Sequence, residues 1–324
     1  MATTKTKRVL ALFLTIILFS LVGYGISARQ NIEDWWRLRN YKPSTIIEGL
    51  ASATTMNEFG RKLFYVYEPI LNDKNTFNQN CKDSEKSVVL GCYVSKTGIY
   101  IFDITDERLA GIEEVTAAHE MLHVAYERLS KDKAWVDNMV TNAFKEVKSE
   151  RIRKTIEQYK AKDNTVVTNE LHSILATEVR NLPKDLENYY SKYFTNRKAI
   201  VDLAERYEAA FSEREAKIKA YDSQLATLKI QIENNEQQLN LIKNQLNNEK
   251  NRLDSLIEDQ KVEEYNRAVP GYNNLVRKYN SLAASARSLI EQYNQIVASR
   301  NSIAVEENQL IKAIDSRPEN IQTQ

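Results

Sequence analysis

The chain has 324 residues, enough for more than one structural unit, and 27% of them are charged. Only 8 glycines and 5 prolines are present, so few turns and much helix are expected. The net charge is +1 and no basic stripe with interleaved aromatic residues occurs. This argues against a nucleic-acid partner, because phosphate binding needs concentrated Lys and Arg.

The N-terminal residues have the composition of a membrane anchor. After a short basic tail, the segment 9–26 contains no charged residue. A helix of that length extends about 27 Å, which is enough to cross the hydrocarbon core of a bilayer. The pattern predicts a transmembrane anchor that holds the chain in a lipid bilayer. A signal peptide cleaved near Gly25-Ile26-Ser27 is the alternative.

Two cysteines, Cys81 and Cys92, are the only ones in the chain and lie close together in the sequence. Such a pair is typical of a disulfide in an oxidising compartment. Two free thiols, or a zinc site that uses them, are the alternatives. Lys and Arg lie on both sides of 9–26 and do not fix its orientation. The cysteines therefore lead to the prediction of a single-pass cell-membrane protein with most of its chain outside the cytoplasm.

The middle of the chain predicts helices and one β-hairpin. Two runs rich in branched and aromatic residues, Ser87–Val94 and Gly98–Ile104, are joined by a short turn, which indicates a hairpin. Thr105 or Asp106 can cap the helix that follows it. Apolar spacing predicts helices over Thr55–Tyr67, Val115–Leu129, Trp135–Val147, Ile152–Lys160 and Val166–Asn181.

The string H-E-M-L-H at residues 119–123 lies within one of these helices. Positions i and i+4 share a helix face, so His119 and His123 can bind one metal ion. Glu120 is turned about 100° from His119 and can reach a metal-bound water without binding the metal. This arrangement predicts a Zn²⁺ site in which the histidines are ligands and Glu120 is the general base. An ordinary polar helix face is the alternative.

A catalytic zinc site needs a third protein ligand and leaves one position for water. The candidates lie downstream, in the stretch 169–178. Glu170 and Glu178 are eight residues apart and lie on nearly one helix face. His172 lies about 160° from Glu170 on the same helix. Only one face can be directed at the metal, so the three residues are competing hypotheses.

With this H-E-x-x-H string and the Asn-Glu pair at residues 169 and 170, the chain resembles the gluzincin metallopeptidases. Those enzymes pair the string with a glutamate on a later helix. The resemblance covers about residues 90–182 and implies a zincin-like fold. It also implies that Glu170 is the third zinc ligand, with Glu178 and then His172 as alternatives.

The sequence departs from the family pattern at two supporting groups. Enzymes of the thermolysin type place an aspartate four residues after the third ligand, where this chain has Ile174. Ser173, Thr177 or Glu178 could substitute for it. The family's downstream catalytic histidine has no equivalent, since no histidine follows His172. A tyrosine could stabilise the oxyanion instead, although packing is the better-supported role for each candidate: Tyr126, Tyr189, Tyr190 and Tyr193.

The resemblance implies a zinc-dependent endopeptidase whose substrates are proteins or peptides. Zinc activates a water molecule, Glu120 takes its proton, and the resulting hydroxide attacks the peptide carbonyl. By the same resemblance, the run Gly98–Ile104 could pair with an extended substrate. An internal strand of the sheet is the alternative for this run.

From about residue 196 the sequence becomes a sustained heptad repeat, which predicts a coiled coil. Apolar residues recur every seven positions over Phe211–Leu253 and again over Leu275–Leu310. Pro270-Gly271 lies between the two series and predicts the turn of an antiparallel hairpin. The Asn-rich stretch Asn247–Asn251 is the alternative turn. The hairpin could hold two copies of the chain together or bind an envelope protein, and a solvated scaffold is the alternative.

These features together predict an α+β, predominantly helical chain, with a small zincin-like domain followed by a long coiled-coil hairpin. The rival function is a non-catalytic scaffold or interaction protein of the cell envelope, built on the coiled coil with a degenerate zincin domain. The intact Glu120 argues against that rival. The expected organisation is a tail at 1–8, the anchor at 9–26, a juxtamembrane linker at 27–47, a zincin-like metallopeptidase domain at 48–195, the coiled-coil hairpin at 196–316 and a disordered tail at 317–324.

Overall fold

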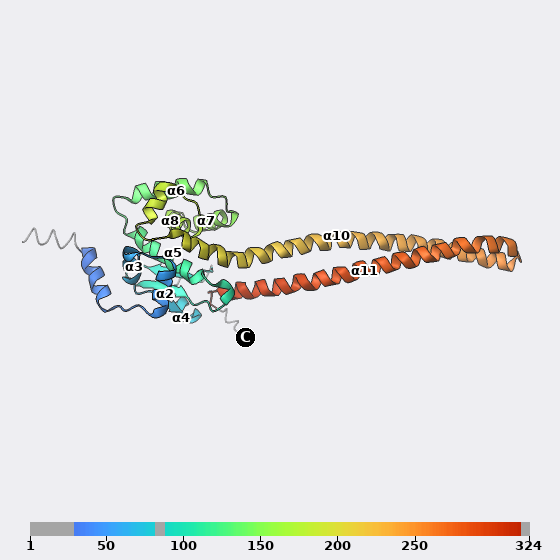
Figure 1. Ribbon diagram of the computed structural model, residues 1–324, viewed down its shortest axis with the longest axis horizontal. Helices are drawn as coiled ribbons and strands as arrows, with labels where there is room; N and C mark the ends of the chain where they lie inside the picture. Colours follow the sequence, from blue (N-terminus) through green and yellow to red (C-terminus); the bar gives the residue numbers. More distant parts are fainter. Residues whose placement is uncertain (1–28, 82–87, 319–324) are drawn as a thin grey trace, which may run out of the picture. The chain divides into compact units, whose positions relative to one another are not determined.

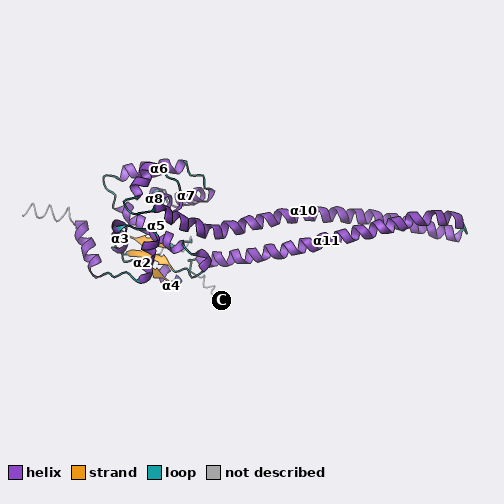
Figure 2. Cartoon of the chain, in the orientation of Figure 1, coloured by secondary structure: helices purple, strands orange, loops and turns teal. Residues whose placement is uncertain are grey.

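The computed structural model describes residues 29–81 and 88–318 (Figure 1). Helices dominate this part of the chain, and one small sheet lies among them (Figure 2). The prediction of an α+β, mainly helical chain is confirmed at this level.

The described residues fall into two compact units. The first unit comprises the chain up to Glu208 together with the residues from Ala313 onward, and it contains the sheet and the shorter helices. The second unit, Ala209–Lys312, consists of most of two long helices, α10 (Arg197–Glu258) and α11 (Val262–Ile314).

The sheet of the first unit has three strands in the order β1-β3-β2. The central strand, β3 (Gly98–Phe102), pairs in parallel with β1 (Ile70–Asn72) and antiparallel with β2 (Gly91–Val94). The predicted hairpin is therefore present. Because β3 has partners on both sides, the expectation that it receives an extended substrate is wrong. The edge strands of this sheet are β1 and β2.

The two faces of β3 pack against different partners, as the alternation of side chains along a strand requires. Ile99 and Ile101 belong to the main core. Tyr100 and Phe102 belong to a smaller cluster with Phe77, which lies on α4 (Lys74–Asn80). The Cys81–Cys92 disulfide, with its Cα atoms 6.0 Å apart, closes the chain around this smaller cluster and confirms the predicted pairing.

The helices of the first unit bury their apolar stripes in one main core. The helix with the H-E-x-x-H string is α5 (Ile112–Glu127), and Gly111 is its N-cap. The φ of +106° at Gly111 and its close approach to Leu203 exclude a side chain there. Asp106, predicted to cap this helix, caps a short 3-10 turn before it instead. The other helices are α2 (Thr45–Ala53), α3 (Glu58–Tyr65), α6 (Lys133–Lys145), α7 (Glu150–Lys162), α8 (Val167–Glu178) and α9 (Lys184–Tyr190).

In the second unit, α10 and α11 lie alongside each other (Figure 1). Two ion pairs show that they run antiparallel: Arg214 with Glu306 at 3.1 Å, and Asp222 with Arg300 at 2.5 Å. The heptad residues of Phe211–Leu253 are partly or fully buried, whereas most positions between them are exposed. Apolar packing between the two helices therefore follows the seven-residue repeat.

The turn of this pair lies at residues 259–261, so neither Pro270-Gly271 nor Asn247–Asn251 forms it. Gln260 adopts a φ of +60°, and the Lys261 N–H donates to the Leu256 carbonyl at 2.9 Å. This bond and the one from the Gln260 N–H to the Ile257 carbonyl at 3.0 Å satisfy carbonyls at the end of α10 locally, as at many helix ends. Pro270 lies inside α11, where it removes one backbone donor without ending the helix.

The predicted location, a single-pass cell-membrane protein with most of its chain outside the cytoplasm, is contradicted. Within residues 29–81 and 88–318, no helix combines the length and apolar composition that a membrane crossing requires. The helices α10 and α11 are long enough, but charged side chains interrupt both. The segment predicted as the anchor, 9–26, and the last residues of the predicted tail lie outside the described residues.

Candidate metal centre

Two packed helices, α5 and α8, carry the candidate metal ligands. Met121 and Leu122 of α5 are fully buried in the core, as is Leu175 of α8. The burial of these faces fixes the rotation of each helix. The polar positions of α5 and the first turn of α8 are thereby directed at one another.

His119, Glu120 and His123 form a cluster on α5. Each offers a nitrogen or oxygen atom, and these atoms all lie within 4.8 Å of one another. The two imidazole rings are 4.7 Å apart, as expected for positions i and i+4 of one helix. The group could hold a metal ion, since imidazole and carboxylate are both common zinc ligands.

Glu170 of α8 faces both histidines. Its carboxylate oxygens lie 3.4 Å from Nε2 of His119 and 3.7 Å from Nε2 of His123. Oε2 is buried without a hydrogen-bond partner. Burial would raise the pKa of Glu170, but the neighbouring His119 and His123 outweigh it and hold the pKa below its usual value. The structure thus favours an anionic Glu170 beside the two imidazoles.

The imidazole of His123 is oriented by Asn169. Its Nδ1 lies 3.0 Å from Oδ1 of Asn169, and because an amide oxygen only accepts, Nδ1 carries the proton. In the neutral ring, Nε2 then keeps its lone pair and points towards Glu170. Ser173 adds a longer contact of 3.4 Å between its Oγ and the same Nδ1. Of the substitutes predicted for the family's aspartate, Ser173 contacts a histidine, whereas Thr177 bonds the Ser173 carbonyl.

The two alternative third ligands have other partners. Glu178 forms an ion pair with Arg151 of α7 at 2.5 Å. His172 is completely buried, and its Nε2 lies 2.9 Å from the hydroxyl of Tyr189. Only Glu170 among the three candidates is brought to the pair of histidines on α5.

None of the four tyrosines considered from the sequence is bonded to the metal cluster. Tyr126 donates to Asp137 at 2.7 Å. Tyr190 donates to the His172 carbonyl, while Tyr189 and Tyr193 contact each other. These contacts agree with packing, the role preferred for each from the sequence.

A fifth tyrosine, Tyr159 of α7, lies beside the cluster and was missed from the sequence. Burial and the carboxylates of Glu170 and Glu120 raise its pKa, so its hydroxyl stays protonated. That hydroxyl in turn helps to lower the pKa of Glu170. Tyr159 lies on the apolar stripe of α7, so the sequence pattern predicts only packing for it and not an effect on Glu170.

Glu120 is enclosed by the edge strand β2. It is 5% exposed, and a Cβ at Gly91 would lie 2.9 Å from its Cγ and Oε1. Burial raises the pKa of Glu120 to about 7, and Glu170 adds to the rise. His123 and a hydrogen bond from the backbone N–H of Tyr93 oppose it. Gly91 is therefore required because only a glycine lets β2 approach this carboxylate.

Comparison of the chain with models of protein families, with curated proteins and with solved structures gives no match. The function is therefore inferred from the site itself.

Below neutral pH, the buried His172 is expected to make the metal-free protein less stable. Burial lowers the pKa of His172 to about 3 from its usual 6.5, so the unfolded chain binds a proton that the folded chain excludes. The contribution of the neutral His172 to the free energy of unfolding is present in full above pH 6.5 and is lost as the pH falls towards 3. The free energy of unfolding should lose up to about 1.4 kcal/mol per pH unit in this range.

Urea unfolding in a chelator, at a series of pH values, measures this slope. The variant His172→Phe keeps an aromatic ring against Tyr126, Tyr189 and Tyr190 but cannot take up a proton. Between pH 6.5 and 3, the free energy of unfolding of this variant should fall less steeply with decreasing pH than that of the parent, by up to about 1.4 kcal/mol per pH unit. Equal slopes for the two proteins would show that His172 does not control acid stability.

Proposed function

We propose that the chain is a zinc-dependent endopeptidase that hydrolyses peptide bonds in proteins or peptides. The observation that carries this proposal is the convergence of Nε2 of His119 and Nε2 of His123 on one buried carboxylate, Glu170. A second carboxylate, Glu120, lies within 4.8 Å of the same two imidazoles, and we assign it the role of base rather than ligand.

The donor set suits zinc. Ligand atoms bound about 2.1 Å from a tetrahedral zinc stand about 3.4 Å apart. The distances from the Glu170 carboxylate to the two imidazoles, 3.4 and 3.7 Å, match that spacing and are long for hydrogen bonds. The unpartnered Oε2 of Glu170 is also the kind of buried oxygen that a cation satisfies. His119, His123 and Glu170 would hold the ion and leave a fourth position open.

The residues divide the chemistry between them. A zinc ion held there would supply a Lewis acid that polarises a carbonyl and makes water more acidic. Glu120 accepts the proton of the attacking water and returns it to the leaving amine. Asn169 keeps the Nδ1 proton of His123 in place, which presents Nε2 to the metal. Glu120 is the better base of the two glutamates because burial raises its pKa, and Gly91 lets β2 pack against it.

The free edge of β2 would hold the substrate. The Phe102 N–H donates to the Leu90 carbonyl at 2.8 Å, so these residues form a hydrogen-bonded pair. Such pairs alternate along an antiparallel ladder, which gives Cys92 the next pair with β3. Gly91 and Tyr93 therefore direct their backbone groups to the other edge of β2, beside Glu120. The Tyr93 N–H is taken by Glu120, which leaves the Gly91 groups and the Tyr93 carbonyl for a peptide. An extended peptide that pairs with this edge brings a carbonyl group close to the base.

Replacing Gly91 with alanine is expected to impair hydrolysis without releasing the metal. The new Cβ would lie 2.5 Å from Thr116 and 2.9 Å from Glu120, so the base or the strand must shift. A shift of about 1 Å can cost about 100-fold in rate, which we expect in kcat/KM for a peptide. Gly49→Ala in α2 is the control, because nothing lies within 4 Å of its new Cβ. Parental activity in Gly91→Ala would contradict the placement of Glu120.

Casein cleavage by the purified full-length chain tests the proposed function. Cleavage should cease with 1,10-phenanthroline and return when zinc is added. Cleavage that survives complete zinc removal would contradict the assignment. So would a zinc-loaded protein that cleaves neither casein nor an unstructured peptide, and the chain would then be better explained as a scaffold built on α10 and α11.

A further inference from the structure

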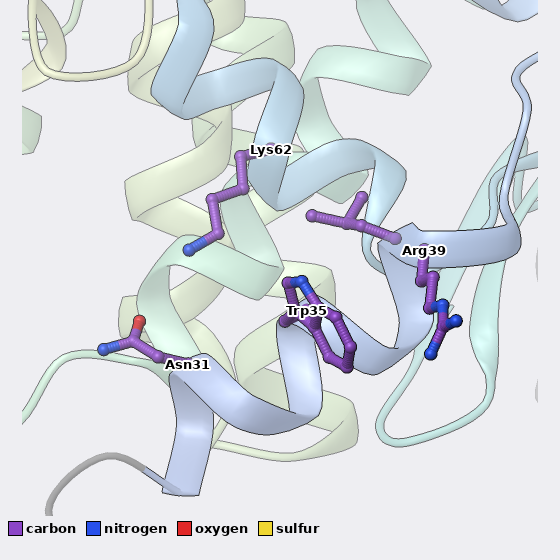
Figure 3. Close-up of a pocket in the computed structure, with 5 residues that line it drawn as sticks. Asn31, Trp35, Arg39 and Lys62 are labelled. Atoms are coloured by element: carbon purple, nitrogen blue, oxygen red, sulfur yellow. The ribbon is translucent and has the colours of Figure 1, made fainter.

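The helical segment 29–40 is fastened to the end of α5 by a buried ion pair. Asp34 is 2% exposed, and its two oxygens each lie 2.9 Å from the guanidinium of Arg128, the residue that follows α5. Gln30 donates to the same carboxylate at 3.1 Å, and Lys62 of α3 lies 3.3 Å from it. Lys62 extends from α3 towards the segment that carries Asn31 and Trp35 (Figure 3). A carboxylate with this many donors holds the segment in a defined position.

The same segment contacts the turn between β2 and β3. Arg37 donates to the Lys96 carbonyl at 2.6 Å, and Lys96 has a positive φ of 64° in that turn. Next to this contact, Ser95 donates to Glu127, the last residue of α5, at 2.7 Å. The segment, the end of α5 and the turn therefore meet at one junction.

Tyr67 connects this junction to β2. The guanidinium groups of Arg37 and Arg128 lie 5.2 and 5.5 Å from the centre of its ring. The ring of Tyr93 stands edge-on against it at 4.8 Å. The carbonyl of Tyr67 also accepts a hydrogen bond of 3.0 Å from the backbone N–H of Ile99 in β3. Tyr67 thus contacts both β2 and β3, and Arg37 of segment 29–40 packs on Tyr67.

We infer that segment 29–40 is a clasp that positions β2 against Glu120, with Asp34 and Arg128 as positioning residues. Tyr93 carries the effect, because its ring packs on Tyr67 and its strand, β2, packs directly on Glu120 at Gly91. Without the clasp, the hairpin loses the contact between Arg37 and Lys96. Arg128, whose guanidinium lies beside Tyr67, also loses the negative charge of Asp34. The consequence for catalysis rests on the proposed function, but the consequence for the position of β2 does not.

The variant Asp34→Asn in the full-length chain tests the clasp by hydrogen exchange. Backbone amides of residues 91–99 and of the last turn of α5 should exchange at least about tenfold faster, while those of α6 and α7 keep their rates. In the zinc-loaded enzyme, kcat should fall several-fold with an unchanged zinc content. Asp34→Glu, which keeps the charge, should restore part of kcat. Unchanged exchange in 91–99, or equal acceleration throughout the first unit, would overturn the inference.

Two further variants complete the test. Asp222→Asn removes a carboxylate that two nitrogens of Arg300 contact in the second unit, and it should alter neither the exchange of β2 nor kcat. Arg37→Gln serves if Asp34→Asn does not fold, since it leaves the buried pair intact. It should accelerate exchange in residues 93–97 but not at the end of α5. Unchanged exchange in residues 93–97 would overturn the inference. A parent without zinc or activity would refute the proposed function alone, because exchange is measured independently.

Discussion

Glu120→Gln is expected to lower peptide hydrolysis by about 10²–10⁴-fold while the protein keeps its zinc. An amide has nearly the shape of the carboxylate and can still accept the hydrogen bond from the Tyr93 N–H, so β2 stays in place. It cannot accept a proton from water, which removes the general base. The measurement is kcat/KM for a peptide together with zinc content by atomic absorption.

Glu114→Gln is the matched control, because Glu114 lies on the same helix outside the metal cluster. It should retain the parental kcat/KM. If Glu120→Gln loses zinc together with activity, Glu120 is a ligand and the division of roles between the two glutamates is wrong. If it retains activity, some other group is the base.

Arg197→Ala is expected to cost about 3–5 kcal/mol in the free energy of unfolding. The guanidinium is buried at the start of α10 and donates to the carbonyls of Ala176 and Val179 at 2.9 and 2.7 Å, which close the C-terminal end of α8. It also forms a two-bond pair with Glu187 at 2.9 and 2.5 Å. Removing it leaves several polar groups without a partner in the core. Urea unfolding followed by circular dichroism measures the loss.

Arg180→Ala provides the comparison for this prediction. Arg180 also pairs with carboxylates, Asp202 and Glu205, but on the surface, so its loss should cost much less free energy of unfolding than the loss of Arg197. Arg197→Lys should recover only part of the difference, since an ammonium group cannot reach all the acceptors of a guanidinium. Equal effects of the two alanine variants would contradict the role given to Arg197 at the end of α8.

The features that could be predicted from the sequence are those set by residues at short, regular spacings along the chain. His119 and His123 share a face because α-helical geometry alone places them so. The heptad residues over Phe211–Leu253 are partly or fully buried because apolar residues every seven positions form one stripe on a helix. The hairpin of β2 and β3 and the disulfide were also within reach, since each joins residues close in the sequence.

The rest depends on contacts between distant residues, which leave no local pattern. Helical spacing left Glu170, Glu178 and His172 as rivals, and the choice depends on Arg151, which pairs with Glu178. Gly91 reads as an ordinary strand glycine until Glu120 packs on it. The turn at residues 259–261 contains neither Gly nor Pro, because Gln260 supplies the left-handed residue that Pro270-Gly271 was expected to supply.

The zinc site is tested by the zinc content of the full-length chain, measured beside that of three variants: Glu170→Ala, Glu178→Ala and His172→Ala. We predict about one zinc per chain in the parent, in Glu178→Ala and in His172→Ala, because neither of those side chains faces the histidines of α5. Glu170→Ala should lose most of its zinc while remaining folded. A parent that binds no zinc after the metal is supplied, or a Glu170→Ala variant that binds it as tightly as the parent, would contradict a zinc site formed by His119, His123 and Glu170.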